Sequence, residues 1–360
     1  MSGTARVRVA LVGCGRIAHV HCGYLRLLPQ VELAGACDPN ESARAALTAR
    51  WQVPTYADVD ELLSATQPDV VHVLTPPATH AAVACDLLRR GVHVLIEKPM
   101  AMSTAEADTV LATAQRAGRF VTVDHNRWFD PVVRRAVGLL DAGALGRLVG
   151  VDVVLGAAAD TGEQGLDWKA SLPGGGLYDV APHAVYMLCG FAGPVRALHV
   201  VAQRASDTRL VEVRMAAACE RALATVAMTV QTRPFTNRVT VFGSAATAEV
   251  NLNNMTLVVR RTRKVPKLVG KVLPNLDEAA QLLRATVVNG VEFLRGRQRF
   301  YPGMGVHLQA LYEALSRGEP PPVGADEARE PVRVVEEIWR QAGVPPPAAS
   351  GATGGACTPL

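Results

Sequence analysis

Short apolar runs alternate with amphipathic segments over the first 125 residues. The apolar runs have the length of buried strands and lie at Val7–Val12, Val31–Cys37, Val70–Leu74, His93–Ile96 and Phe120–Val123. Helical periodicity predicts helices at Arg16–Leu28, Glu41–Arg50, Val59–Ala65, Thr79–Arg90 and Thr104–Ala117, with a short strand at Thr55–Tyr56. This alternation is typical of a parallel sheet covered by helices on both faces, so residues 1–125 are expected to form a doubly wound α/β domain.

The pattern changes after residue 125. A helix is expected at Pro131–Asp141, and alternating apolar and polar residues then predict antiparallel strands with one solvated face. These strands are expected at Leu148–Leu155, Arg196–Gln203, Thr208–Met215, Ala222–Gln231 and Arg238–Phe242. Further helices are expected at Leu177–Leu188, Leu276–Leu294, Val306–Ser316 and Glu327–Gln341. We therefore expect an α+β domain at 126–343 and a disordered tail at 344–360, which is rich in Pro, Ala and Gly.

Composition narrows the class of protein. The 360 residues are 49% hydrophobic and 19% charged, which excludes a disordered chain. The net charge of +4 is too mild for a dedicated nucleic-acid binder. The seven cysteines are irregularly spaced and form no Cys-x-x-Cys pair, so neither a disulfide scaffold nor a metal site is expected. This cysteine usage fits a cytoplasmic protein.

A glycine motif follows the first predicted strand. Gly13-Cys14-Gly15-Arg16-Ile17-Ala18 reads GxGxxA between a strand and a helix. The first glycine allows the tight turn, the second lets the backbone approach a pyrophosphate, and the small Ala18 lets helix and strand pack closely. Asp38 ends the next strand, where a carboxylate accepts ribose hydroxyls and repels a 2′-phosphate. The motif predicts a dinucleotide site that prefers NAD, although Arg44 could still reach the phosphate of NADP.

Further motifs complete a family pattern. Thr75-Pro76-Pro77 ends the fourth strand, Glu97-Lys98-Pro99 ends the fifth, and Gly174–His183 reads GGGxxxDxxxH. In this order the motifs resemble the glucose–fructose oxidoreductase / inositol dehydrogenase family, written Gfo/Idh/MocA, over residues 5 to 341. The resemblance implies a Rossmann domain, then a domain with an open, mostly antiparallel sheet, and a homo-oligomer, a dimer or a tetramer.

Lys98 is the first expected catalytic residue. It lies at the carboxyl end of a parallel strand, where ligands collect in open α/β sheets. The resemblance places it in the active site, and its ammonium would stabilise developing alkoxide charge on the substrate. By spacing alone, a surface lysine in a turn is the favoured interpretation. The Lys98–Pro99 bond is expected to be cis, as is common in the family.

Asp179 and His183 form the second expected catalytic group. They are spaced i and i+4, so both point to one face of a helix, and Pro182 is compatible with that helix if it starts near Asp179. His183 is interpreted as the general base on the substrate hydroxyl, with Asp179 binding substrate. Asp179 could instead cap the helix and His183 be a buried structural residue. Tyr186 stands where the family commonly has an Asp, which leaves the substrate class open.

Other positions match the family less specifically. Thr75, Pro76, His80 and Glu97 are expected beside the ribose and nicotinamide. Asn126, in a segment resembling the family's NRRF.P, is expected near cofactor and substrate, with His125 as a further pocket residue. Trp168 and Lys169 resemble a pair near the nicotinamide, although packing explains Trp168 equally well.

A basic segment falls outside the family pattern. Residues 260–300 carry ten Lys and Arg against Asp277, Glu278 and Glu292, a net charge of +7. The segment spans an amphipathic pattern, and the favoured interpretation is a solvated helix packed on the second domain. The alternatives are a site for a nucleotide-sugar phosphate and contact with an acidic membrane surface.

The sequence therefore predicts an NAD(P)-dependent oxidoreductase acting on a sugar, polyol or nucleotide-sugar. Two alternatives remain open: an NAD-retaining glycosidase or lyase, and a non-catalytic NAD-bound regulator. Accumulation of NADH during turnover distinguishes the first alternative from a dehydrogenase.

Overall fold

The computed structural model describes residues 6–156, 172, 174–206, 209–295 and 301–344. By internal contacts the described chain divides into unit 1, residues 6–125 and 304–336, and unit 2, residues 126–303 and 337–344. The sequence placed 304–336 in a continuous second domain, whereas in the structure these residues group with unit 1. The expected disordered tail falls outside the described residues apart from Val344.

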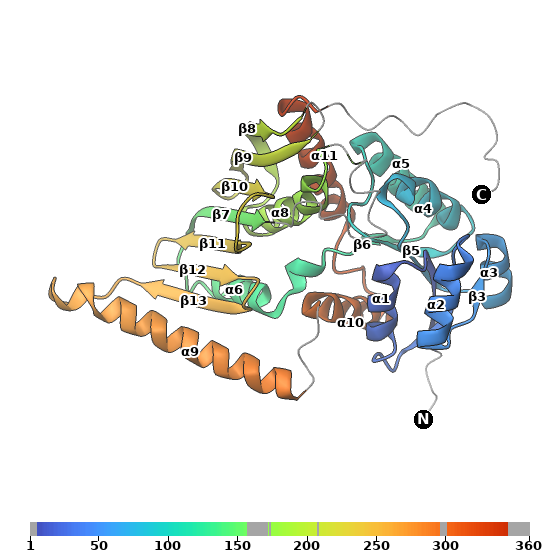
Figure 1. The fold of residues 1–360 in the computed structure, drawn as a ribbon, viewed down its shortest axis with the longest axis horizontal. Helices are drawn as coiled ribbons and strands as arrows, with labels where there is room; N and C mark the ends of the chain where they lie inside the picture. The colour runs from blue at the N-terminus through green and yellow to red at the C-terminus, as the bar shows by residue number, and fades with distance from the viewer. Residues whose placement is uncertain (1–5, 157–171, 173, 207–208, 296–300, 345–360) are drawn as a thin grey trace. The chain divides into compact units, whose positions relative to one another are not determined.

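Unit 1 is built on a fully parallel sheet of six strands (Figure 1). The strands are β1 (Val7–Val12), β2 (Val31–Cys37), β3 (Thr55–Tyr56), β4 (Val70–Val73), β5 (His93–Ile96) and β6 (Val121–Val123). Their spatial order is β3-β2-β1-β4-β5-β6. The strand order reverses between β1 and β4, and ligands of doubly wound folds bind beside the carboxyl ends of the strands at that point.

The helices of unit 1 are α1 (Arg16–Leu25), α2 (Glu41–Trp51), α3 (Val59–Thr66), α4 (His80–Arg89), α5 (Thr104–Ala117) and, from Met304 onward, α10 (Pro302–Ser316). Three of them begin at side chains that cap them. Asn40, Asp58 and Ser103 each accept a hydrogen bond from a first-turn amide of α2, α3 and α5. No side chain caps α1, which follows Gly15, or α4.

Unit 2 is built on a seven-stranded sheet in the order β13-β12-β11-β7-β10-β9-β8. The strands are β7 (Leu148–Gly156), β8 (Val195–Arg204), β9 (Leu210–Cys219), β10 (Leu223–Thr229), β11 (Asn237–Gly243), β12 (Ala246–Asn251) and β13 (Thr256–Arg261). All pairs are antiparallel except β7 with β10. The expected open, mostly antiparallel sheet is confirmed.

Three helices of unit 2 contact this sheet. Helix α6 (Pro131–Asp141) contacts β12 and β13, α8 (Leu177–Ala192) contacts β7, β9 and β10, and α9 (Leu273–Leu294) contacts β13 (Figure 1). The last helix, α11 (Ala325–Gln341), has its first twelve residues in unit 1 and its last five in unit 2. Among the described residues, no helix is both long and apolar enough to cross a membrane.

Candidate active site

The turn between β1 and α1 has the backbone geometry of a dinucleotide-binding loop. Gly13 has a φ of +102°, and a Cβ there would lie 2.8 Å from the carbonyl carbon and oxygen of Leu74, the residue that follows β4. Only glycine fits this position. Gly15 differs, because a Cβ on it would meet no protein atom within 4 Å. The packing of the chain leaves Gly15 unexplained, whereas the approach of a pyrophosphate to the backbone explains it.

The first residues of α1 present the helix N-terminus. Ala18 is fully buried, which allows the helix to pack on the sheet, while Arg16 is exposed and Ile17 is half-buried. The positive end of the helix dipole and its first amides favour a bound anion. These residues fit the phosphates of NAD, as expected from the sequence.

Asp38 is tied to the glycine turn. One of its carboxylate oxygens accepts a hydrogen bond from the amide of Cys14 at 2.8 Å, and the other accepts from the amide of Asn40 at 2.8 Å. The guanidinium of Arg44 donates to the backbone carbonyl of Asp38 at 2.7 Å and not to its carboxylate. The carboxylate therefore keeps its negative charge beside the loop, where it disfavours a 2′-phosphate.

His80 connects the carboxyl ends of β4 and β5. Its ring nitrogens lie 2.8 Å from the carbonyl oxygen of Thr75 and 2.7 Å from that of Pro99. Burial lowers the pKa of His80, although both carbonyl contacts act in the opposite direction. A buried ring that spans two carbonyls acts as a positioning group, so His80 holds the Thr75-Pro76 turn against the turn that carries Lys98.

The Lys98–Pro99 bond is cis, as expected. Lys98 is half-exposed, whereas the adjacent Glu97 is buried and its amide donates to the carbonyl of Val73 on β4 at 2.9 Å. The turn therefore buries Glu97 and leaves Lys98 half-exposed at the carboxyl end of β5.

Unit 1 contains a buried polar network. Its residues lie far apart in the sequence, so sequence analysis did not predict their contacts. His72 lies 2.7 Å from the hydroxyl of Tyr312 and 2.9 Å from the ring of His21. His21 in turn lies 3.9 Å from Asp124, whose other carboxylate oxygen lies 2.8 Å from His307. All five side chains are fully buried. The network connects α10 to β4, to α1 and to the end of β6, which accounts for the grouping of residues 304–336 with unit 1.

Charge in this network is concentrated on Asp124. Burial alone would raise the pKa of Asp124, but the hydrogen bond and charge of His307 outweigh burial and lower it. Burial lowers the pKa of His21 to about 4 and that of His72 further below its usual range. At neutral pH His21 and His72 are therefore neutral beside an ionised Asp124.

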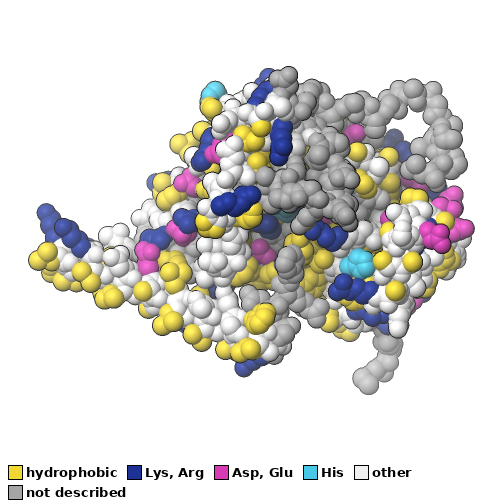
Figure 2. All heavy atoms as spheres, in the orientation of Figure 1, with side chains coloured by type: hydrophobic (Ala, Val, Ile, Leu, Met, Phe, Trp, Pro, Cys, Tyr) yellow, Lys and Arg dark blue, Asp and Glu magenta, His cyan; other side chains and the backbone are white. Residues whose placement is uncertain are grey.

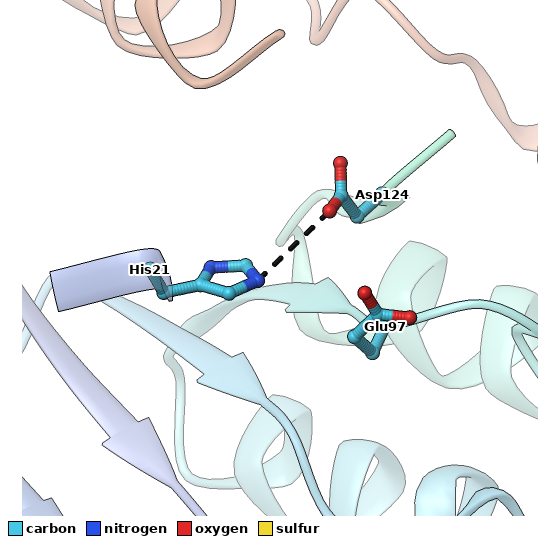
Figure 3. Close-up of side chains that lie close together, drawn as sticks. All are labelled: His21, Glu97 and Asp124. Carbon is cyan, nitrogen blue, oxygen red and sulfur yellow. Dashed lines mark ion pairs between the residues drawn. The ribbon is translucent and has the colours of Figure 1, made fainter. Parts of the chain in front are cut away.

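His21, Glu97 and Asp124 could together hold a cation. Their potential ligand atoms lie within 4.8 Å of one another (Figure 3), and imidazole and carboxylate groups are typical metal ligands. Their arrangement was not expected, because the sequence indicated no metal ligands. His21 and Asp124 also belong to the buried network described above, and the site chemistry below does not depend on a metal.

His125, expected in the pocket, is buried at the end of β6. Burial lowers its pKa to about 3, so its ring is neutral near pH 7. A neutral buried imidazole can accept or donate a hydrogen bond but supplies no charge to a substrate.

In unit 2, helix α8 carries Asp179 and His183 on one face. Both side chains are half-exposed, while most of their helical neighbours are buried. The helix begins at Leu177, as the periodicity predicted, so the start near Asp179 that Pro182 favoured is wrong and the proline lies inside the helix. Its missing amide cannot donate to the carbonyl of Tyr178, so the helix has one backbone hydrogen bond fewer there.

Tyr186 orients His183, a role that the sequence did not reveal. The Tyr186 hydroxyl lies 2.6 Å from Nδ1 of His183, accepts from the amide of Arg127 at 3.1 Å and donates to Oδ1 of Asn126 at 3.4 Å. The short contact with Nδ1 therefore orients the ring of His183. A hydrogen bond donated by Nδ1 to this hydroxyl would place the basic lone pair of the imidazole on Nε2. The i, i+3 spacing of His183 and Tyr186 was the available signal.

Of the remaining expected residues, the structure describes Asn126 but not Trp168 or Lys169. Asn126 is buried and belongs to the His183 group through Tyr186.

Two family models match the chain. Residues 7–125 match the model described as "Oxidoreductase family, NAD-binding Rossmann fold" of GFO_IDH_MocA, and residues 133–249 match the "GFO/IDH/MocA C-terminal domain". Together they cover more than half of the chain.

Named relatives align over part of their length. UDP-N-acetylglucosamine 3-dehydrogenase of Acidithiobacillus ferrooxidans is 32% identical over 128 residues, which are 36% of this chain and 40% of the relative. D-glucoside 3-dehydrogenase of Escherichia coli is 29% identical over 189 residues, 51% of this chain and 54% of the relative. The chain thus spans about half the length of these curated relatives.

Solved structures share the whole fold. WlbA dehydrogenase from Bordetella pertussis, in complex with NADH and UDP-GlcNAcA, has a TM-score of 0.75 at 19% identity and covers 94% of this chain and 96% of its own. GenD2 from gentamicin A biosynthesis, in complex with NAD, has a TM-score of 0.75 at 24% identity and covers 95% of each chain. At these identities the likeness concerns the fold.

Proposed function

Because this chain belongs to the Gfo/Idh/MocA oxidoreductase family, we propose that it is an NAD-dependent dehydrogenase acting on a hydroxyl-bearing carbon of a sugar or nucleotide-sugar. The observation that carries the proposal is the hydrogen-bond group around His183, in which the Tyr186 hydroxyl lies 2.6 Å from Nδ1 and orients an imidazole on the same helix face as Asp179. Removal of a hydroxyl proton is the step that protein side chains must supply in alcohol oxidation.

Unit 1 binds the cofactor in this proposal. The Gly13–Ala18 loop holds the pyrophosphate, Asp38 the adenosine ribose, and the Thr75-Pro76 turn the nicotinamide side. NAD, when bound, supplies the hydride acceptor, and the protein supplies orientation and charge.

The proposed chemistry uses His183 for the proton and Lys98 for charge. His183 accepts the proton of a substrate hydroxyl at Nε2 while its Nδ1 is oriented by the Tyr186 hydroxyl. Lys98 supplies an ammonium that stabilises developing negative charge on a substrate oxygen. Asp179, one helical turn before His183, binds a neighbouring hydroxyl.

Cofactor preference follows from Asp38. A 2′-phosphate would lie against its carboxylate, so NADH is expected to bind more tightly than NADPH. Dissociation constants for the two nucleotides measure this preference, and Asp38→Ser should narrow the gap because Ser removes the negative charge. NADPH binding as tight as NADH binding would contradict it.

A nucleotide-sugar is the favoured substrate class, because relatives with this fold are named for UDP-sugars or are solved with one. The test is incubation with NAD and a panel of UDP-sugars, free sugars and polyols, read by NADH absorbance. NADH accumulating in proportion to oxidised sugar supports the proposal. Conversion of a glycoside without net NADH would support the NAD-retaining alternative, and tight NAD binding without any turnover would favour a regulator.

A further inference from the structure

The basic segment at 260–300 contains many of the exposed apolar side chains in the part of the chain that the structure describes. Among the described residues, 17 large hydrophobic side chains are exposed, and 12 of them lie between Val265 and Leu294. The helix contacts β13 of the second domain, as expected, but its apolar side is not covered there. Monomeric soluble proteins rarely leave so much contiguous apolar surface uncovered, so the segment requires a partner.

Helix α9 turns its polar side towards the sheet. The side-chain amide of Gln281 bonds both the amide and the carbonyl of Val259 on β13, at 2.8 and 3.0 Å. Glu278 pairs with Arg260 at 2.6 Å, and Asn289 donates to the carbonyls of Asn254 and Met255. These contacts extend over three turns and hold the helix lengthwise beside β13 (Figure 1).

The opposite side of α9 is apolar. At 100° per residue, Leu276, Leu283, Val287 and Leu294 lie opposite Gln281, and they are 61%, 68%, 58% and 85% exposed. The three acidic residues of the helix, Asp277, Glu278 and Glu292, are all half-buried on the side that faces the sheet. The outward face therefore carries no negative charge.

Cations adjoin this apolar face. Lys264, Lys267 and Lys271 alternate with the exposed Val265, Leu268, Val269 and Val272 just before α9. The acidic residues of the helix are already paired, Asp277 with Arg263, Glu278 with Arg260 and Glu292 with Arg295. Figure 2 shows cationic side chains gathered at one end of the segment and apolar side chains along it. The segment thus combines unneutralised positive charge with an uncharged apolar face.

We propose that residues 264–294 dock the protein on the surface of an anionic lipid bilayer. In this arrangement α9 lies in the plane of the interface, its outward face enters the headgroup and acyl boundary, and the three lysines contact lipid phosphates. The polar contacts with β13 fix the helix along its length, so it presents its side and not its end.

A second copy of the chain would also cover the apolar face, but it would not complement the charge of the three lysines. A parallel pair of α9 helices would oppose the two lysine-rich ends. A two-fold pair would bring the lysines of each copy to the Arg295 end of the other, where Glu292 is already paired. Neither arrangement supplies an anion to the lysines, whereas anionic lipid does.

The test is sedimentation of the full chain with vesicles of phosphatidylcholine alone or mixed with phosphatidylglycerol. We expect binding to the anionic vesicles that weakens as salt rises from about 0.01 M to about 0.15 M, over which the Debye length falls from ~30 to ~8 Å. The double variant Leu283→Glu/Val287→Glu should lower binding more than about tenfold, because both side chains enter the lipid. Lys264→Glu/Lys267→Glu/Lys271→Glu should abolish the preference for anionic vesicles.

Leu27→Glu is the matched control, since Leu27 is 54% exposed but lies in unit 1, and it should bind like the wild type. Thermal unfolding and NADH binding of all variants should match the wild type, which excludes misfolding. Failure of the wild type to bind anionic vesicles, or equal binding by Leu283→Glu/Val287→Glu, would overturn the proposal. A change from oligomer to monomer in that variant, without any vesicle binding by the wild type, would identify a second copy as the occupant.

Discussion

At the scale of single residues, one hydroxyl orients the proposed base. Tyr186 is almost fully buried, and its hydroxyl lies 2.6 Å from Nδ1 of His183. The residue was noted in the sequence only as a departure from the family's usual Asp. A phenol and a carboxylate can both accept from an imidazole, so the substitution preserves the orientation of the ring while removing a negative charge from the site.

Tyr186→Phe should therefore lower kcat by about tenfold to a hundredfold, the range expected when a hydrogen bond to a reacting group is lost. The KM of the sugar and the affinity for NADH should change little, because neither ligand requires the hydroxyl. Tyr178→Phe is the control in the same helix, where the buried ring stacks near Trp339 and not on His183. Equal kcat values for Tyr186→Phe and the wild type would show that the Tyr186 hydroxyl does not assist His183 in catalysis.

A second residue gives the stability of unit 2 a pH dependence. Burial raises the pKa of Asp130 to about 6, against smaller opposing effects from Arg127 and the amide of Gly303. Between about pH 4 and pH 6 the folded state holds a proton that the unfolded state releases, so stability falls as pH rises through this window. A shift of roughly two pKa units corresponds to about 3 kcal/mol.

Asp130→Asn should remove this dependence, since the amide oxygen still accepts from Gly303 but does not ionise. Urea unfolding should show the variant gaining up to about 3 kcal/mol relative to the wild type between about pH 4 and about pH 7. A constant difference between the two proteins over that range would show that Asp130 titrates normally.

At the scale of elements, strands made of continuous apolar residues were predicted correctly, whereas strands that mix apolar, small and polar residues were missed. Strands β1, β2 and β5 begin and end where the sequence placed them, because strands buried on both faces have uninterrupted apolar residues. Strands β12 and β13 were missed, since Ala246–Asn251 and Thr256–Arg261 mix small, polar and basic residues. Their pairing with β11 and with each other defines them, and pairing is not local in sequence.

The β1–α1 turn allows a prediction that separates folding from binding. Gly13→Ala should destabilise the protein by about 2 kcal/mol or more, because its φ of +102° and its contact with Leu74 both exclude a Cβ. Gly15→Ala should change the unfolding free energy by less than about 1 kcal/mol, since its φ of −70° suits alanine and no protein atom lies near.

Gly15→Ala should nevertheless weaken NADH binding by about tenfold or more, because the added methyl group occupies the approach of the pyrophosphate. Chemical unfolding and fluorescence titration with NADH measure the two quantities separately. An unchanged dissociation constant in a folded Gly15→Ala protein would argue against nucleotide binding at this loop.

At the scale of the whole molecule, the order of motifs predicted the fold of each domain and the family. It did not predict the contacts between segments that are distant in sequence. His21, Asp124 and His307 form one buried network although 286 positions separate the first from the last. For the same reason the sequence placed residues 304–336 in the second domain, whereas in the structure they group with unit 1. Buried contacts such as that of Tyr312 with His72 account for this grouping. The helix α9 was expected in nearly the correct place, but its amphipathic pattern does not tell which side meets the sheet.

In the proposed reaction, His183 accepts the proton of the substrate hydroxyl while hydride passes to NAD. The most direct test of this role is the single-turnover rate of NADH formation with the best substrate of the panel, compared between the wild type and His183→Asn. The rate should fall by about 10²–10⁴-fold in the variant, while the dissociation constant of NADH stays the same. If His183→Asn formed NADH at the rate of the wild type, His183 would not be the group that accepts the proton.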